Sequence, residues 1–412
     1  MVGAGPCGSA LALLLARRGI SVQLVEARTH HQHLPRGEGL MPSGLEALGR
    51  LGLGQSLEAL PHLALRSWDF WLEQEPLFSV AEPIGGGAPC SLIGTAALLD
   101  TLLLEARRSA ALHWHPGRRA SALRFCPGHH RVSGVVLDDG SVLEADLVVA
   151  CDGRDSSLRQ QAGLEREHDP QVVAVLWFVL EGPATAALRN WVAGRFITLV
   201  GGGESLAVYS PAGGGLRLGW LGSDPEPAGE SEAMAQGSAP PDWPLRWAQL
   251  SPPELADLWR ALPPEAVPAP LAVAIQPGLA PRWHRPGLLL LGDAAHPMSP
   301  LRAQGLNMAL RDGVVAAERL AAVLEAKAWA ALGGTERQAA LEAALMAIQR
   351  ARQPEIRRVQ ALQREELGRA QLLRHTPWLR RLLTITRRWS GPLLAKRWQA
   401  GQPTLRRGLP LG

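Results

Sequence analysis

The residues of this chain that are best suited to hold a polar ligand follow a short apolar run. Residues 287–291 read Gly-Leu-Leu-Leu-Leu, and residues 292–297 read Gly-Asp-Ala-Ala-His-Pro. The run predicts a buried strand. The carboxylate of Asp293 is therefore expected at the carboxyl end of that strand, where it can accept hydrogen bonds from sugar-like hydroxyl groups. A helix is expected after the small residues, and its first backbone N–H groups can bind a delocalised negative charge.

A glycine pattern near the amino terminus predicts a second ligand-binding turn. Gly3, Gly5 and Gly8 form the pattern G-x-G-x-x-G, and a helical stretch at 9–18 and a strand ending at Glu26 follow them. In such a βαβ unit the glycines let a pyrophosphate approach the start of the helix, and an acid about 20 residues later binds a ribose. Glu26 stands 18 residues after the third glycine and fits that role. The unit predicts dinucleotide binding without separating FAD from NAD.

The strand that should precede this turn is short. Only Met1 and Val2 precede Gly3, although a strand normally has about five residues. We therefore expect that the true start lies upstream or that the strand has been shortened.

A third turn follows the strand-like run at 142–150. Asp152 and Gly153 stand just after it, before a stretch that fits a short helix. Taken alone, these residues fit a strand-end turn before an N-capped helix as well as a ligand-binding turn. From these residues alone, both interpretations stay open.

In this order and at these separations, the three motifs resemble those of the FAD-dependent aromatic hydroxylases, the group A flavoprotein monooxygenases related to p-hydroxybenzoate hydroxylase. The resemblance covers about residues 1–330 and indicates FAD rather than free NAD. It implies that Asp293 holds the ribityl chain of FAD and that the backbone of residues 305–307 lies against the N1 and C2=O side of the flavin. It also places Arg36 near the FAD phosphates. The residues that it assigns to FAD are Gly3, Gly5, Gly8, Glu26, Arg36, Asp152, Gly153, Gly292, Asp293, Gly305, Leu306 and Asn307.

The resemblance also implies an α/β fold in three parts. A Rossmann-like FAD-binding domain, an inserted antiparallel β-sheet that binds substrate, and a helical C-terminal region are expected. The predicted boundaries are 1–68, 91–171 and 280–330 for the first part, 69–90 and 172–279 for the second, and 331–412 for the third.

The reaction implied by the resemblance is hydroxylation of an aromatic or other electron-rich small molecule. NADPH or NADH reduces FAD, and O2 then gives a C4a-hydroperoxyflavin that transfers its distal oxygen. Pro300 is expected to flank this site. Arg302 departs from the small residues common in the family, and we predict that it binds a substrate carboxylate or phenolate in a bidentate contact. Its alternatives are a solvent-facing position or a pair with Asp312, and His296 is expected to be structural.

The middle of the chain lacks several residue types that often carry out acid–base or nucleophilic catalysis, which favours a cofactor-dependent reaction. Residues 171–283 contain no His, Cys or Lys, so no Ser-His-Asp or Cys-His arrangement can form there. The oxidation must then be carried by the cofactor, with the protein supplying a dry pocket. Several aromatic residues on predicted strands could line this pocket or fill a core: Trp177, Phe178, Phe196, Tyr209 and Trp220.

Two other functions fit the same motifs. One is an FAD oxidoreductase of this fold without oxygen insertion, such as an isoprenoid-chain reductase. The other is a flavin-bound protein that docks on a membrane. A metal site is not expected, because the histidines at 30–33 lack carboxylate or thiolate partners and the four cysteines form no pair. The cysteine usage favours a reducing, cytoplasmic compartment.

The C-terminal tail is strongly basic. Residues 350–412 contain fifteen Lys or Arg and three Asp or Glu, and apolar residues recur at helical spacing between 378 and 389. The tail could dock on the acidic remainder of the chain, or the segment 373–398 could lie on an anionic membrane surface. Nucleic acid is not expected, because no binding motif accompanies the charge. The sequence decides neither the oligomeric state nor NADH against NADPH.

Overall fold

The nucleotide-binding part of the chain is built on a mainly parallel sheet. The computed structural model describes residues 1–30, 38–53, 56, 58–127, 130–222 and 241–411. Val2 makes parallel bridges to Val25 on one side and to Ala150 on the other, so it joins two strand pairs into one sheet. In spatial order the strands are β7 (Leu112–Pro116), β1 (Val22–Glu26), the bridge at Val2, β11 (Val148–Ala150), β20 (Leu288–Leu290) and the antiparallel β19 (His284–Arg285).

Two helices of this part pack against each other at a glycine. Helices α1 (Pro6–Arg17) and α10 (Gln304–Leu324) meet at Gly313, where an added Cβ would lie 3.1 Å from the Cys7 carbonyl oxygen. Helix α1 begins earlier than the predicted stretch at 9–18, because Pro6 has a backbone angle suited to the first turn. The other helices here are α2 (Pro42–Arg50), α4 (Thr95–Ala106) and α5 (Ser157–Gln161).

The run at 142–150, predicted as one strand, is two strands in different sheets. Its first half pairs with β9 in a small antiparallel sheet, while its second half is β11 of the parallel sheet. The small sheet consists of β8 (Ala120–Phe125), β9 (Val132–Leu137) and β10 (Val142–Glu144). Further short pairings join β2 (Gly39–Leu40) and β3 (His62–Ala64) to β6 (Ser91–Ile93), and β12 (Glu167–His168) to β18 (Gly278–Leu279).

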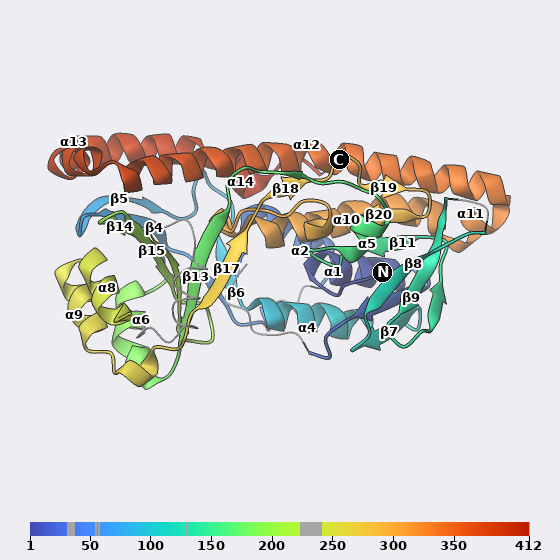
Figure 1. Ribbon diagram of the computed structural model, residues 1–412, viewed down its shortest axis with the longest axis horizontal. Coiled ribbons are helices and arrows are strands. Elements are labelled where there is room, and N and C mark those ends of the chain that lie inside the picture. The colour runs from blue at the N-terminus through green and yellow to red at the C-terminus, as the bar shows by residue number, and fades with distance from the viewer. Residues whose placement is uncertain (31–37, 54–55, 57, 128–129, 223–240, 412) are drawn as a thin grey trace.

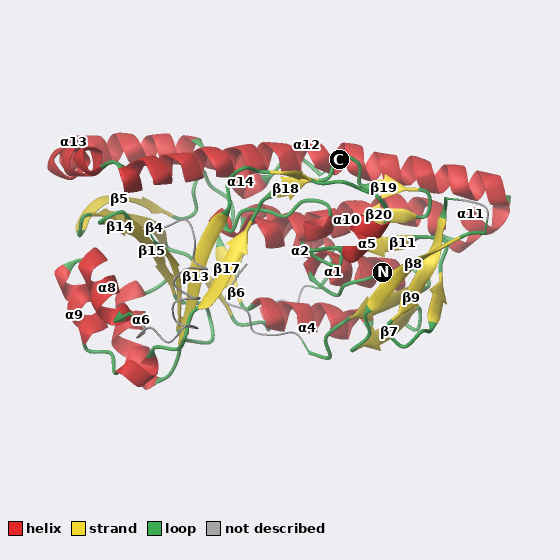
Figure 2. Ribbon diagram, viewed as in Figure 1, coloured by secondary structure: helices red, strands yellow, loops and turns green. Residues whose placement is uncertain are grey.

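A seven-stranded sheet stands beside the nucleotide-binding part (Figure 2). Its neighbouring strands are antiparallel, as predicted, except that β14 and β4 are parallel. The β4–β5 hairpin comes from an earlier, separate segment of the chain. The order is β17 (Leu271–Ile275), β13 (Val173–Leu180), β16 (Leu216–Leu221), β15 (Glu204–Tyr209), β14 (Arg195–Gly201), β4 (Ser67–Leu72) and β5 (Glu75–Ala81). The domain boundaries given above stay predictions.

The two faces of this sheet have different environments. Phe178 packs edge-to-face on Trp243 and Trp247, with ring centroids 4.9 and 5.0 Å apart, in a core closed by three helices. The neighbouring Trp177 points to the opposite face, because successive strand residues alternate. The aromatic residues expected to line a pocket or fill a core are therefore divided between two environments. The helices over the Phe178 face are α6 (Ala186–Val192), α8 (Trp243–Leu250) and α9 (Pro253–Arg260).

Long helices join the two parts from one side (Figure 1). Helix α12 (Gly334–His375) has 42 residues, which corresponds to about 63 Å. It lies along the nucleotide-binding part, and α13 (Pro377–Ala400) continues over β5 of the seven-stranded sheet. Two short helices complete this region, α11 (Ala326–Ala331) and α14 (Gln402–Arg407). Within the described part of the chain, no helix combines the length and apolar character that crossing a bilayer requires.

Candidate flavin site

The first glycine turn is packed so tightly that two of its glycines cannot carry a side chain. Gly3 has a φ of +97°, and a Cβ there would collide with the carbonyl oxygen of Cys151. A Cβ on Gly8 would collide with the carbonyl oxygen of Gly3. Gly5 differs, because an added Cβ would meet nothing within 4 Å. The turn therefore has an open side at Gly5, directly before α1, where a phosphate could approach the helix N-terminus.

Glu26 ends β1 beside this turn. One carboxylate oxygen accepts a hydrogen bond from the N–H of Ala4 at 2.7 Å, and the other accepts from Arg28 N–H at 3.1 Å. The side chain is half-buried, so the acid is fixed at the strand end next to the glycine turn. A contact with ribose hydroxyls stays a prediction.

Asp152 presents a buried acceptor at the next strand end. Its Oδ2 accepts from the N–H of Leu158 at 3.3 Å, while Oδ1 is buried and has no hydrogen-bond partner among the described residues. Burial raises the pKa of this carboxyl group above its ordinary value. Gly153 beside it has a φ of +89° and open space at its Cβ position. An unsatisfied buried acceptor next to open backbone fits a ligand that donates a hydrogen bond.

Arg159 connects this second turn to the third. Its Nη1 donates to the carbonyl oxygens of Arg154 and Ala294, at 3.3 Å each. Ser156 caps α5 by accepting from the N–H of Arg159 at 3.0 Å. The turn after β11 and the turn after β20 are thus held together, as expected for adjacent parallel strands that end at one edge.

The third turn lies against the start of α10. Gly292 has a φ of +60° and begins the 3-10 turn Gly292–Ala294. The Asp293 Oδ1 atom lies 4.0 Å from the position that a Cβ on Gly305 would take. Residues 304–307 form the first helical turn, whose N–H groups have no partner within the helix. A carboxylate and a row of backbone donors therefore face the same place.

Asn307 holds strand β2 against this helix start. Its side-chain nitrogen donates to the carbonyl oxygens of Gly39 and Ala303, at 2.9 and 2.8 Å. Its oxygen accepts from the N–H of Met41 at 2.8 Å. The side chain is therefore used inside the protein, which leaves only the backbone of residues 305–307 for a ligand. Arg36, predicted to lie near the phosphates, is outside the described residues.

A buried charge network that the sequence did not reveal lies behind the third turn. Asp312 accepts from Gly292 N–H at 3.1 Å, contacts His296 Nε2 at 2.6 Å and pairs with Arg352 at 2.7 Å. Arg352 also pairs with Glu355, which binds Arg311 at 3.0 Å. Burial alone would raise the pKa of Asp312, but His296 and Arg352 lower it to about 2. His296 thus has the structural position expected for it.

Arg302 occupies neither of the two alternative positions considered for it. Its guanidinium group binds the carboxylate of Glu366 on α12, with Nε 3.0 and 3.1 Å from the two oxygens. It also lies over three aromatic rings, with Trp398 at 4.5 Å, Trp68 at 4.9 Å and Phe70 at 5.7 Å. Its predicted contact with substrate stays a prediction, and that contact would compete with Glu366.

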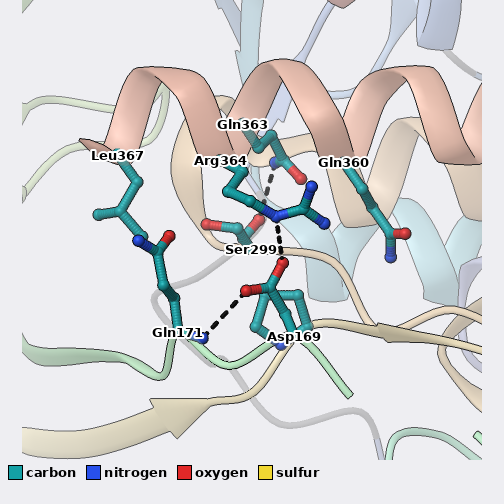
Figure 3. A pocket seen from close by; sticks show the side chains of 8 residues that line it. Asp169, Gln171, Ser299, Gln360, Gln363, Arg364 and Leu367 are labelled. Atoms are coloured by element: carbon teal, nitrogen blue, oxygen red, sulfur yellow. Dashed lines mark hydrogen bonds and ion pairs between the residues drawn. The ribbon is translucent and has the colours of Figure 1, made fainter. Parts of the chain in front are cut away.

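The loop that contains Pro300 and Arg302 has a strained backbone. Arg302 and Ala303 have φ values of +61° and +49°, which non-glycine residues rarely adopt. Helix α12 supports this loop through glutamine amides, since Gln363 donates to the carbonyl oxygens of Ser299 and Leu301 at 3.0 and 2.6 Å. Figure 3 shows the small hollow beside this contact, where Arg364 pairs with Asp169 at 2.7 Å. Strain held in this way is typical of functional loops.

The sheet face opposite the Phe178 core presents aromatic and polar groups toward β2. Tyr209 stacks on Phe196 with ring centroids 5.3 Å apart. Glu38, just before β2, is 4% exposed; it pairs with Arg217 at 3.2 Å, and its charge acts on Tyr209. Burial and the charge of Glu38 raise the pKa of Tyr209 well above its ordinary value, so its hydroxyl group stays protonated. Sequence patterns singled out Tyr209 and Phe196 but neither Glu38 nor Arg217.

The described residues contain no cluster of three His, Cys, Asp or Glu side chains arranged for a metal ion. His31 and His33 lie outside the described residues. The polar groups gathered around residues 3–8, 152–153 and 292–307 are instead backbone N–H donors and single carboxylate acceptors. Such a set fits the pyrophosphate, ribityl chain and flavin ring of FAD.

Comparison with known proteins agrees with this geometry. The model of the FAD binding domain family matches residues 1–203 and 272–371. The chain belongs to this family. It is an FAD-dependent oxidoreductase of the aromatic hydroxylase family, whose members typically use NAD(P)H as co-substrate. The predicted family, fold class and cofactor are confirmed.

Three similar proteins illustrate the range of this family. The chain is 33% identical over 326 residues to 6-methylpretetramide 4-monooxygenase of Streptomyces rimosus, covering 77% of this chain and 73% of that protein. It is 27% identical over 350 residues to menaquinone reductase of Mycobacterium tuberculosis (strain ATCC 25618 / H37Rv), covering 81% and 78%. PqsL of Pseudomonas aeruginosa in complex with 2-aminobenzoylacetate shares the fold at a TM-score of 0.74 and 21% identity, covering 93% and 97%.

Proposed function

We propose that this enzyme hydroxylates an electron-rich aromatic molecule held between the start of α10 and the Tyr209 face of the seven-stranded sheet. The observation that carries this proposal is a short chain of contacts. Asn307 in the first turn of α10 binds the carbonyl oxygen of Gly39. Glu38, which precedes Gly39, pairs with Arg217 on the sheet, and its charge acts on the nearby Tyr209. The predicted flavin position and a polar, aromatic surface are therefore neighbours.

Residues of the glycine and aspartate turns and of the start of α10 would bind FAD, whereas residues of the sheet would contact the substrate. FAD, when bound, supplies the redox chemistry, and Gly5, Asp152, Asp293 and residues 305–307 would hold it. Trp177, Phe196 and Tyr209 offer flat apolar surfaces for an aromatic ring. Tyr209 and Arg217 add one hydroxyl group and one cation, which could orient a phenol or carboxylate.

Pro300 and Arg302 remain proposed site residues at the edge of this region. The strained backbone at Arg302 and its position close to Gly305 support a role near the reacting ring. Because Glu366 and three aromatic rings already hold the guanidinium group, we propose that Arg302 acts mainly by shaping this loop, with substrate contact as its second role.

The proposed reaction is tested by measuring NAD(P)H oxidation and O2 uptake by the FAD-loaded protein with a panel of phenols and naphthols that includes 6-methylpretetramide. We expect at least one compound to accelerate both rates and to yield a product heavier by one oxygen atom. Labelling with 18O2 identifies the source of that atom. Acceleration of NAD(P)H oxidation with no oxygenated product from any compound would overturn the proposal.

The similarity to menaquinone reductase supports a second candidate reaction, reduction without oxygen insertion. In that case NAD(P)H oxidation with menaquinone would proceed equally well without O2. Anaerobic turnover that yields a reduced product separates this reaction from hydroxylation.

We also propose a cytoplasmic location, supported by the four free cysteines. Two of them, Cys7 and Cys90, are buried. We also propose peripheral membrane contact through residues 373–398.

A further inference from the structure

Helix α13 is fixed to the body of the protein along one side. Arg380 is buried and pairs with Glu73, and Arg387 pairs with Glu75 at 3.0 Å. Gly391 lies directly on β5, where an added Cβ would collide with the carbonyl oxygen of Leu77. This side of the helix is therefore the docked side, and two of its arginines bind acids of the body.

The opposite side of α13 carries large apolar side chains that nothing covers within the described chain. Their spacing of three or four residues puts them in one stripe, about half a turn away from Arg380, Arg387 and Gly391. Water-exposed tryptophans at this density are unusual for a single surface helix. The exposed fractions are 69% for Trp378, 49% for Leu382, 68% for Ile385, 75% for Trp389 and 68% for Leu393.

Basic residues border this stripe. Arg381 and Arg388 lie on one side of it, Arg397 lies on the other, and Lys396 lies at its end; all four are exposed. The sequence of α13, from Pro377 to Ala400, contains no Asp or Glu. The exposed side of the helix is thus apolar in the middle and positive at its borders.

We propose that this stripe lies on the surface of an anionic lipid membrane, with α13 parallel to that surface. Tryptophan and leucine side chains enter the boundary between headgroups and acyl chains, and the bordering cations bind lipid phosphates. A second copy of the chain fits less well, because two such positive faces would repel each other. The proposal concerns binding alone and does not depend on the reaction catalysed.

The same helix reaches the candidate site. Trp398, near the end of α13, donates from Nε1 to Glu366 at 3.0 Å and lies against Arg302. A membrane-bound α13 would therefore hold the Arg302 loop close to the lipid surface. An apolar substrate dissolved in the membrane could then reach the site over a short path.

Vesicle flotation of the full-length, FAD-loaded protein tests the proposal. Phosphatidylcholine vesicles with and without phosphatidylglycerol are the probes. We expect flotation with the anionic vesicles and at least about tenfold weaker binding with phosphatidylcholine alone or at high salt.

Two double variants and one control separate the apolar and the electrostatic contributions of α13 to membrane binding. Trp378→Ser with Trp389→Ser removes the apolar contact, and Arg381→Gln with Arg388→Gln removes charge; each pair should weaken binding about tenfold or more. Leu104→Ser, at an exposed position of α4, should bind as the unchanged protein does. Circular dichroism and FAD content confirm that each variant is folded.

Three results would overturn the membrane assignment. They are no flotation of the unchanged protein, equal binding of the tryptophan variant, and a stable dimer in sedimentation velocity that the tryptophan variant abolishes. The last would assign the stripe to a second copy of the chain.

Discussion

The guanidinium group of Arg302 and the carboxylate of Glu366 face each other between the strained loop and helix α12, 64 residues apart in the chain. Burial would raise the pKa of Glu366, but Arg302 lowers it below the ordinary value, so the pair is charged. Trp398 donates to the same carboxylate at 3.0 Å. One ion pair thus connects the loop beside the predicted flavin ring to both long C-terminal helices.

Replacing Arg302 by Ala should weaken substrate binding and uncouple NAD(P)H oxidation from hydroxylation. If the arginine contacts substrate or shapes its loop, we expect the KM for the aromatic substrate to rise about tenfold, which corresponds to about 1.4 kcal/mol. More peroxide should be released for each NAD(P)H consumed. Steady-state kinetics with peroxide detection measures both quantities.

Glu366→Gln is the matched control for Arg302→Ala. It keeps the arginine but removes the competing charge, so a substrate-binding arginine predicts an unchanged or lower KM. If both variants lose the same thermal stability while KM and peroxide release stay unchanged, the pair is structural only.

Gly5→Ala should separate folding from cofactor binding. The added Cβ meets nothing within 4 Å in the protein, so the melting temperature of the protein without cofactor should stay the same. The methyl group would occupy the side from which a pyrophosphate approaches, and we expect FAD affinity to fall roughly tenfold or more. Fluorescence titration of FAD measures the affinity.

Gly49→Ala is the control for this effect. An added Cβ at Gly49 in α2 also meets nothing within 4 Å. Alanine in a helix should stabilise the protein by about 0.5–1 kcal/mol and leave FAD affinity unchanged. Equal FAD affinity in both variants would rule out pyrophosphate binding at Gly5.

Asp293→Ala should weaken FAD binding without unfolding the protein. Losing a hydrogen bond to a charged group costs about 1.5–3 kcal/mol, so FAD affinity should fall roughly 10- to 100-fold. Asp257→Ala, at an exposed acid of α9, is the comparison and should retain FAD fully. Retention of FAD by Asp293→Ala through gel filtration would argue against the ribityl contact.

The low pKa of Asp312 predicts a specific acid sensitivity. Its pKa of about 2 in the folded protein lies below the ordinary value of 3.8, so the ionised form is favoured by folding. This contribution is complete above about pH 4 and is lost as the pH falls toward 2, amounting to roughly 2 kcal/mol. Urea unfolding at several pH values measures it.

Asp312→Asn tests the origin of this pH dependence. The variant should be less stable at neutral pH by about 1.5–3 kcal/mol, because Arg352 loses one of its two buried carboxylate partners and keeps Glu355. Its stability should also change less between pH 4 and 2 than that of the unchanged protein. An identical slope in this range would assign the acid sensitivity to other carboxyl groups.

The turns of the candidate flavin site could be predicted from the sequence because each is local. A strand, a glycine turn and a helix follow one another within about 20 residues, and each turn's role depends on neighbours in the chain. The order of Gly3–Gly8, Asp152 and Asp293 then indicated one binding edge. The sequence placed Trp177 and Phe178 on a strand, but only the structure showed which of them faces the helices.

Only the tertiary structure determined which charged side chains form ion pairs. Arg302 pairs with Glu366 rather than Asp312, and Asp312 pairs with Arg352, because α12 packs along α10 and brings residues 40 to 64 positions apart into contact. Packing also decided the orientation of α13. Its sequence indicates an amphipathic basic helix, but the docking of Gly391 on β5 turns Trp378 and Trp389 outward. Local pattern sets the binding turns, whereas partners distant in the chain depend on how the elements pack.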